Sequence, residues 1–228
     1  MTLNNTQSAN WFHRFFAVVL LLMATLGAFA KPAAVVFYGD SLTAAYQLDP
    51  DQGYPALLQQ KVEADNLQAD YEVVASAVSG ETSAGGQARI KWALTGLKRK
   101  KQDVAVFVLA LGSNDGLRGL PVANMQENLQ AILDTVKARY PDAQVVVARM
   151  FMPPNLGEAY REEFANAYVS LAEANDAILI PYLLDGVAGD PKLNLPDGMH
   201  PNAKGQQIIA DNLWPIIKPL LTTDSPQS

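Results

Sequence analysis

The sequence contains no cysteine and only two histidines, His13 and His200, among its 228 residues. Without cysteine the chain forms no disulfide bond and no thiolate metal site, so the folded state must be stable through core packing alone. Two histidines are too few for a histidine-rich zinc site. These absences exclude disulfide-stabilised scaffolds and the common structural zinc sites.

Positive charge is also scarce. The chain has 17 lysine and arginine residues against 23 aspartate and glutamate residues, a formal net charge of −6 at pH 7. Nucleic-acid binding needs basic surfaces that neutralise phosphate, and docking to an anionic membrane needs basic clusters. The charge balance therefore predicts neither nucleic acid nor an anionic membrane surface as a partner.

The N-terminal apolar segment is short. Arg14 is the only charge before it, and the segment from Phe15 to Ala30 has 16 residues, fewer than the roughly 20 that a membrane-spanning helix needs. It ends in Ala28-Phe29-Ala30, which has the small-x-small form of a signal-peptidase site. We predict that residues 1–30 are a signal peptide removed after Ala30, and that the protein is periplasmic or secreted without stable membrane insertion after processing. The alternative is an uncleaved membrane anchor.

The rest of the chain alternates between two patterns. Short β-branched, nearly continuously apolar runs are typical of strands buried on both faces of a parallel sheet; they lie at 34–38, 71–75, 104–111, 144–148 and 177–182. Segments with helical spacing lie at 54–65, 86–99, 121–139, 158–174 and 203–220. Pro121 suits the first turn of its helix. This succession predicts one α/β domain over 31–221, an open parallel sheet of five strands with helices on both faces. Residues 222–228 are expected to form a disordered tail.

Small and polar residues follow four of the five predicted strands. The segments are Gly39-Asp40-Ser41-Leu42, Ser79-Gly80-Glu81-Thr82, Gly112-Ser113-Asn114-Asp115 and, inside a long irregular stretch, Asp197-Gly198-Met199-His200-Pro201. Ligands of open α/β sheets bind beyond the carboxyl ends of the strands. We therefore expect these segments to meet at one site.

The residue types are those that acyl transfer requires. A hydroxyl nucleophile needs a general base, the base needs an orienting carboxylate, and the developing oxyanion needs fixed donors. Ser41, His200 and Asp197 suit the first three roles, because one turn brings Asp197 to the imidazole Nδ1 and leaves Nε2 facing Ser41. The backbone N–H groups of Ser41 and Gly80 and the side-chain amide of Asn114 suit the oxyanion hole.

The four segments resemble the four sequence blocks of the SGNH (GDSL-type) hydrolases, in the family's order. The closest resemblance is to the bacterial periplasmic thioesterase/lysophospholipase/arylesterase branch, which the segments 76–82 and 111–119 match nearly throughout. The resemblance implies a three-layer, flavodoxin-like fold and an oxyanion hole of the kind described above. Ser113 departs from the pattern, because many relatives have a second glycine there.

Each motif also has a purely structural interpretation. Gly39-Asp40-Ser41-Leu42 suits an ordinary strand-to-helix turn, Asp197 suits a helix cap, Asn114 a turn, and Gly80 a positive φ. We assign Asp40 and Asp115 to loop hydrogen bonds beside the site. The combination favours catalysis, since removal of the leader leaves His200 as the only histidine. The absence of a G-x-S-x-G segment argues against the ordinary α/β-hydrolase.

The predicted substrate is a small acyl ester or thioester, of the kinds cleaved by arylesterases, lysophospholipases and acyl-CoA thioesterases. The chemistry needs no metal or cofactor. The acyl group is expected to contact Leu117, Leu120, Met152, Pro153 and Leu156, which lie in two apolar segments. Two alternatives stay open: a carbohydrate O-acetyl esterase with the same site, and a non-catalytic binding protein on the same fold.

The leader yields the first testable prediction. Protein purified from the envelope fraction of cells that export it should begin at Lys31, because cleavage follows Ala30. Intact-mass spectrometry measures this directly. A mature N-terminus that retains the segment 11–30 would contradict cleavage.

Overall fold

The computed structural model describes residues 31–222. The predicted signal peptide, 1–30, and residues 223–228 of the predicted tail lie outside the described residues. Thr222, which the sequence assigned to the tail, is instead the last residue of a helix. Within 31–222, no helix combines the length and the apolar character needed to cross a membrane.

Five strands and six α-helices alternate along this part of the chain. The strands are β1 (Ala33–Gly39), β2 (Tyr71–Ala77), β3 (Val104–Ala110), β4 (Gln144–Ala148) and β5 (Ile178–Ile180). The helices are α2 (Tyr54–Ala64), α3 (Ser83–Arg99), α4 (Ser113–Leu117), α5 (Val122–Arg139), α6 (Glu158–Ala174) and α7 (Ala203–Thr222), with short 3-10 turns η1 (Pro50–Gln52) and η2 (Pro154–Leu156).

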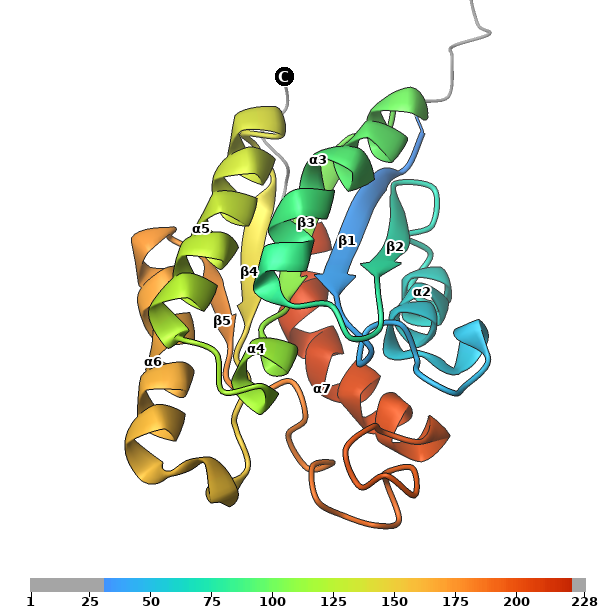
Figure 1. Ribbon diagram of the computed structural model, residues 1–228. Helices are drawn as coiled ribbons and strands as arrows, with labels where there is room; N and C mark the ends of the chain where they lie inside the picture. Colours follow the sequence, from blue (N-terminus) through green and yellow to red (C-terminus); the bar gives the residue numbers. More distant parts are fainter. Residues whose placement is uncertain (1–30, 223–228) are drawn as a thin grey trace, which may run out of the picture. The chain divides into compact units, whose positions relative to one another are not determined.

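The sheet is parallel throughout, with strand order β2-β1-β3-β4-β5. Helices α2 and α7 pack together on one face, while α3, α5 and α6 lie side by side on the other (Figure 1). Right-handed crossovers require this arrangement, because the chain moves one way from β1 to β2 and the opposite way from β2 onward. The prediction of a three-layer, flavodoxin-like fold is confirmed.

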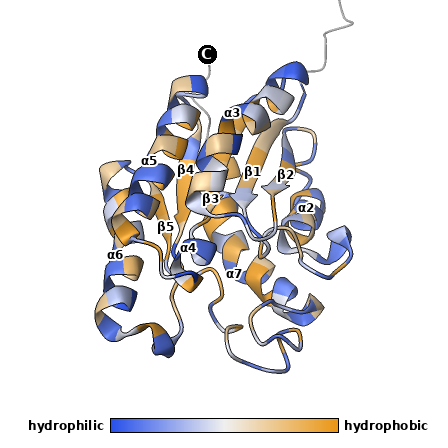
Figure 2. Cartoon of the chain, in the orientation of Figure 1, coloured by the Kyte–Doolittle hydropathy of each residue, from blue (hydrophilic) through white to orange (hydrophobic). Residues whose placement is uncertain are grey.

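The core lies between the central strands and the two helix layers. Strands β1, β3 and β4 are buried over almost their whole length, and Figure 2 shows hydrophobic strands enclosed by helices whose outer sides are hydrophilic. The apolar stripe of α5, which includes Met125, Leu129 and Ile132, is buried as its spacing predicts. The expectation of burial on both faces is wrong for β2 and β5, which are half-exposed because each is an edge strand with one neighbour.

Two helix starts differ from the sequence prediction. Helix α3 begins at Ser83 rather than at 86, because Thr82 caps it by accepting a hydrogen bond from the Gly85 N–H at 3.3 Å. Pro121 precedes α5 as its cap residue instead of lying in the first turn. Helix α4 was not predicted, since a helix of five residues is too short to show a hydrophobic period.

The strand order places the switch point of the sheet at β1. The chain leaves β1 toward β2 on one side and later enters β3 on the other side. Connections that leave in opposite directions open a crevice beyond the carboxyl ends of these strands, and ligands of such folds bind there. Ser41 follows β1, and Asn114 follows β3.

Candidate active site

The turn after β1 fixes Ser41 at the end of the sheet. A side chain at Gly39 would collide with Thr43, so only glycine allows the chain to turn this closely. The buried Asp40 carboxylate accepts a hydrogen bond from the Leu42 N–H at 3.0 Å. The turn thereby presents Ser41, which is only 9% exposed.

A tight turn between β5 and α7 presents Asp197 and His200. The Leu195 N–H donates to the His200 carbonyl at 2.7 Å and closes the turn. Asp197 Oδ1 accepts the backbone N–H groups of Met199 at 2.9 Å and His200 at 3.0 Å. The three-residue spacing therefore fixes the carboxylate beside the imidazole, as the sequence predicts.

Ser41, His200 and Asp197 form one hydrogen-bonded chain. Ser41 Oγ lies 2.9 Å from His200 Nε2, and Asp197 Oδ2 lies 2.7 Å from His200 Nδ1. The two backbone donors, with the N–H of His200 first, lower the pKa of Asp197 to about 2 and keep it ionised. A carboxylate on Nδ1 leaves Nε2 free to take the serine proton.

Gly80 and Asn114 lie at the same edge of the sheet and come from different loops. Gly80 has φ of +78°, which glycine adopts without strain. In the part of the chain that the structure describes, no acceptor is hydrogen-bonded to the backbone N–H of Ser41 or of Gly80. Both N–H groups are thus available to a ligand.

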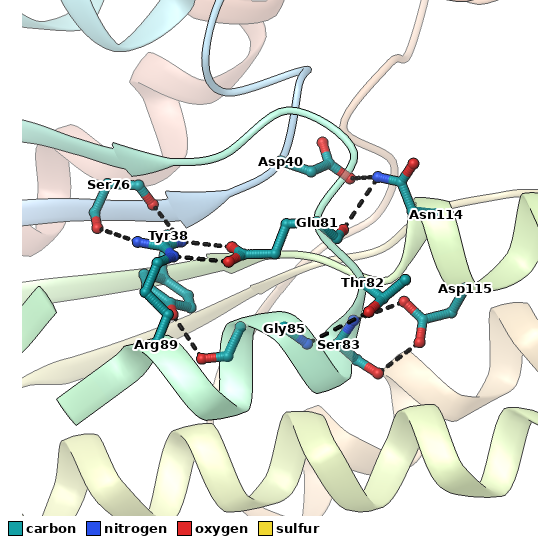
Figure 3. A network of polar contacts seen from close by, with 11 residues as sticks. Tyr38, Asp40, Ser76, Glu81, Thr82, Ser83, Gly85, Arg89, Asn114 and Asp115 are labelled. Atoms are coloured by element: carbon teal, nitrogen blue, oxygen red, sulfur yellow. Dashed lines mark hydrogen bonds and ion pairs between the residues drawn. The ribbon is translucent and has the colours of Figure 1, made fainter. Parts of the chain in front are cut away.

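The side-chain amide nitrogen of Asn114 already donates two hydrogen bonds. Its Nδ2 donates to the Glu81 carbonyl oxygen at 3.1 Å and to Asp40 Oδ2 at 3.3 Å, and Figure 3 shows the amide between these two acceptors. The next residue, Asp115, accepts the N–H and the hydroxyl of Ser83 at 2.7 and 2.6 Å. Helix α4 is thereby tied to the loop that carries Gly80. Asp40 and Asp115 make the loop hydrogen bonds that the sequence assigned to them.

Tyr46 contacts the histidine and was not predicted. The centroid of its ring lies 4.4 Å from that of His200, with the ring planes inclined by 37°. The flanking residues Ala45 and Gln47 have φ of +53° and +59°, values that non-glycine residues rarely adopt. Tyr46 and His200 lie near opposite ends of the domain sequence, so no local sequence pattern could have indicated this contact.

A cavity of about 440 Å³ opens beside Ser41 and His200. Of the predicted acyl contacts, Leu117, Met152 and Pro153 line it. Leu120 and Leu156 do not: Leu120 is 38% exposed, and Leu156 packs against the hydrophobic core.

The cavity is also lined by residues that the sequence analysis did not name as contacts of the acyl group. They include Leu42, Tyr182, Leu184 and Met199. Tyr182 packs edge-to-face on Phe151 with ring centroids 4.9 Å apart, which fixes one wall. The cavity is largely apolar and carries few polar groups, as small-molecule sites commonly are. Among residues 31–222, no three histidine, aspartate or glutamate side chains are grouped so that they could hold a metal ion.

Comparisons with known proteins give concordant matches. The sequence model of the "GDSL-like Lipase/Acylhydrolase family" matches residues 37–208. The chain is 39% identical over 201 residues to "Esterase TesA" of Pseudomonas aeruginosa, covering 88% of this chain and 94% of that protein. It is 34% identical over 225 residues to "Thioesterase 1/protease 1/lysophospholipase L1" of Escherichia coli K12, covering 99% and 100%. The crystal structure of the psychrotrophic esterase EstA from Pseudoalteromonas sp., inhibited by monoethylphosphonate, has a TM-score of 0.74 at 34% identity, covering 83% and 99%.

The burial of Asp40 predicts a pH-dependent effect on stability. Burial raises the pKa of this carboxyl to about 6, while the hydrogen bond from Leu42 opposes the rise. The folded state therefore binds the proton more tightly than the unfolded state. This contribution is complete below the ordinary pKa of 3.8 and is lost as the pH rises through about 6. The variant Asp40→Asn, which stays neutral, should gain stability relative to the parent over that window, by at most about 3 kcal/mol.

Urea unfolding at pH 4 and pH 7.5, followed by circular dichroism, measures the difference. The exposed residue Asp142 provides the control position, and the difference between the two pH values should be larger for Asp40→Asn than for Asp142→Asn. A pH-independent difference between Asp40→Asn and the parent would contradict the prediction.

Proposed function

The chain belongs to the GDSL-like lipase/acylhydrolase family, and from this premise we propose that it is a serine hydrolase that cleaves acyl esters or thioesters. The observation that carries the proposal is the hydrogen-bonded chain from Ser41 Oγ through His200 to Asp197, at 2.9 and 2.7 Å. Ser41 and His200 also line the apolar cavity. A binding protein would have no need of an imidazole aligned on a nearly buried hydroxyl.

The proposed reaction has two halves. Ser41 Oγ attacks the acyl carbonyl carbon while His200 Nε2 takes the hydroxyl proton, and Asp197 stabilises the resulting imidazolium. Collapse of the tetrahedral intermediate breaks the bond to the leaving oxygen or sulfur, which receives that proton from His200. Water then attacks the acyl-serine by the same route and releases the acid.

The oxyanion of each tetrahedral intermediate needs donors that are fixed beforehand. The N–H groups of Ser41 and Gly80, which have no acceptor among residues 31–222, suit this role. The Asn114 amide suits it as well, provided that the substrate oxygen shares or replaces the longer of its two contacts, the one with Asp40 at 3.3 Å. The contact with the Glu81 carbonyl then keeps the amide in place.

The cavity supports an apolar acyl group as the specific part of the substrate. Leu117, Met152, Pro153 and the Phe151–Tyr182 pair provide a wall for an alkyl or aryl chain. The relatives named esterase, thioesterase and lysophospholipase differ in their leaving groups. We therefore place the specificity on the acyl side and a broad tolerance on the leaving-group side.

We also propose that the enzyme acts outside the cytoplasm, on the basis of the predicted signal peptide. Coenzyme A is scarce in that location, so esters are the more suitable physiological substrates. Thioester hydrolysis is then a capability of the site.

Graded loss of activity on substitution tests the proposed roles. Ser41→Ala and His200→Ala should each lower kcat by on the order of 10³–10⁶-fold, because the pair acts as a unit. Asp197→Ala should cost somewhat less, and Asn114→Ala should cost on the order of 10²–10³-fold through the loss of one oxyanion donor. Initial rates with a p-nitrophenyl ester measure kcat and KM, and circular dichroism checks that each variant folds.

Covalent labelling provides the independent measurement. A fluorophosphonate should add one label per chain, and peptide mapping should locate it on Ser41, while Ser41→Ala should stay unlabelled. Labelling that persists in Ser41→Ala, or an unchanged kcat in His200→Ala, would overturn the proposed function.

The cavity predicts a preference for medium or longer acyl chains over acetyl. Each buried methylene contributes about 0.8 kcal/mol, so four more raise kcat/KM by roughly 10²-fold where the wall encloses them all. A panel of p-nitrophenyl esters from acetyl to palmitoyl measures the profile. Leu117→Ala should flatten it, because Leu117 lines the cavity. Leu120→Ala is the control that should preserve it. An acetyl-favouring profile would instead support a carbohydrate O-acetyl esterase.

A further inference from the structure

The backbone of Glu81 contacts a residue of the proposed active site, and its side chain forms an ion pair that is largely shielded from solvent. Its carbonyl oxygen accepts the Asn114 amide at 3.1 Å. Its carboxylate receives two parallel hydrogen bonds from Arg89, at 2.8 Å from Nε and 2.6 Å from Nη2. The side chains of Arg89 and Glu81 are only 16% and 7% exposed. The residue that anchors Asn114 is thus itself held from helix α3, as Figure 3 shows.

Arg89 is fixed in turn by the two strands next to it. Its Nη1 donates to Ser76 Oγ at 2.9 Å and its Nη2 to the Ser76 carbonyl at 3.3 Å, at the end of β2. Its guanidinium lies 4.3 Å from the ring centroid of Tyr38 in β1, and the Tyr38 hydroxyl donates to the Gly86 carbonyl at 2.7 Å. Contacts with α3, β1 and β2 therefore set the position of the Glu81 carboxylate.

A buried ion pair is weak support for stability, because the cost of removing two charges from water offsets their attraction. This pair lies at the loop that carries the Gly80 N–H group, which has no acceptor among residues 31–222, and one of the two acceptors of the Asn114 amide. Arg118 also donates to the Gly80 carbonyl at 2.9 Å, from the end of α4. The polar contacts around Glu81 therefore converge on the proposed oxyanion donors.

The Asn114 amide nitrogen has two hydrogen atoms, and each has an acceptor, the Glu81 carbonyl and the Asp40 carboxylate. Gly80, with its positive φ, gives the loop freedom to move if the Glu81 side chain is released. The amide would then keep only its longer contact, the one with Asp40, and would lose the contact that holds it in place when the substrate oxygen takes that position.

We propose that Glu81 and Arg89 are positioning residues for the oxyanion hole, acting through the Glu81 carbonyl on Asn114. This inference rests on the proposed hydrolase function and deepens it. Positioning of a donor affects the transition state more than substrate binding, so its loss lowers kcat and leaves KM nearly unchanged.

A double-mutant cycle separates positioning from mere structural support. Arg89→Met, in the parent chain, should lower kcat for a p-nitrophenyl ester about 10-fold, within the range that small misplacements cost, with KM changed by less than about twofold. In the Asn114→Ala background the same substitution should lower kcat by less than about twofold, because the donor that it positions is gone. Glu81→Gln, which keeps the shape and loses the charge, should give an intermediate loss in the parent chain.

A remote ion pair provides the matched control. Lys61 contacts Asp211 at 2.6 Å between α2 and α7, far from the oxyanion loop in the fold. Lys61→Met should leave kcat unchanged. If Arg89→Met fails to fold by circular dichroism, Ser76→Ala removes one partner of Arg89 without stranding a charge, and it should show the same dependence on Asn114 at smaller amplitude.

The outcomes distinguish the two proposals. Equal reductions of kcat by Arg89→Met in both backgrounds, or a rise in KM at constant kcat, would overturn the positioning role while the hydrolase proposal stands. Failure of the parent chain to hydrolyse the ester would instead overturn the proposed function.

Discussion

The hydrogen bond between Ser41 and His200 joins residues 159 positions apart. The strand order of the parallel sheet determines how far the chain must reach to form it. Ser41 follows β1 near the middle of the sheet, but His200 follows the edge strand β5, three strands away. At the usual spacing of parallel strands this is roughly 14 Å. The long stretch between β5 and α7 spans that distance. The buried side chain of Gln206 then ties α7 to the nucleophile turn by accepting from the Tyr54 N–H at 2.9 Å and donating to the Leu42 carbonyl at 3.5 Å.

What could be predicted from the sequence follows from this geometry. Strands β1 and β3 are buried on both faces and read as apolar runs, so the residues after them are easily located and must share one edge of the sheet. Ser41 and Asn114 were found in this way, whereas His200 was found because it follows an aspartate in the long stretch after the last predicted strand and is the only histidine outside the predicted leader. The contacts of Tyr46 and Gln206 were not predicted, because each joins elements that are distant in sequence, and those of Arg89 were not, because none leaves a periodic pattern. The acyl wall was predicted only in part: apolar character marks both a cavity and a core, and Leu156 packs against the core instead of lining the cavity.

Two carboxylates near the site, Asp197 and Asp40, have different pKa values because their surroundings differ. Asp197 faces two backbone N–H groups, which stabilise its charge and lower its pKa to about 2. Asp40 is buried beside the nucleophile, and the loss of hydration raises its pKa to about 6. Asp197 contacts the imidazole at 2.7 Å and its lowered pKa keeps it ionised, so it suits the role of partner to His200.

The costly features of the fold gather at one end of the sheet. A buried carboxylate at Asp40 and left-handed residues beside Tyr46 each oppose folding by on the order of 1–3 kcal/mol. Net stabilities of domains are only about 5–15 kcal/mol, so these terms persist only where the rest of the structure enforces them. The apolar central strands supply the driving force. Hydrogen bonds from Arg89 to Glu81, from Ser83 to Asp115 and from Gln206 to Leu42 attach the loops to this core. A loop held this way presents unsatisfied donors to a substrate without collapsing onto its own acceptors, which is the condition that an oxyanion hole must meet.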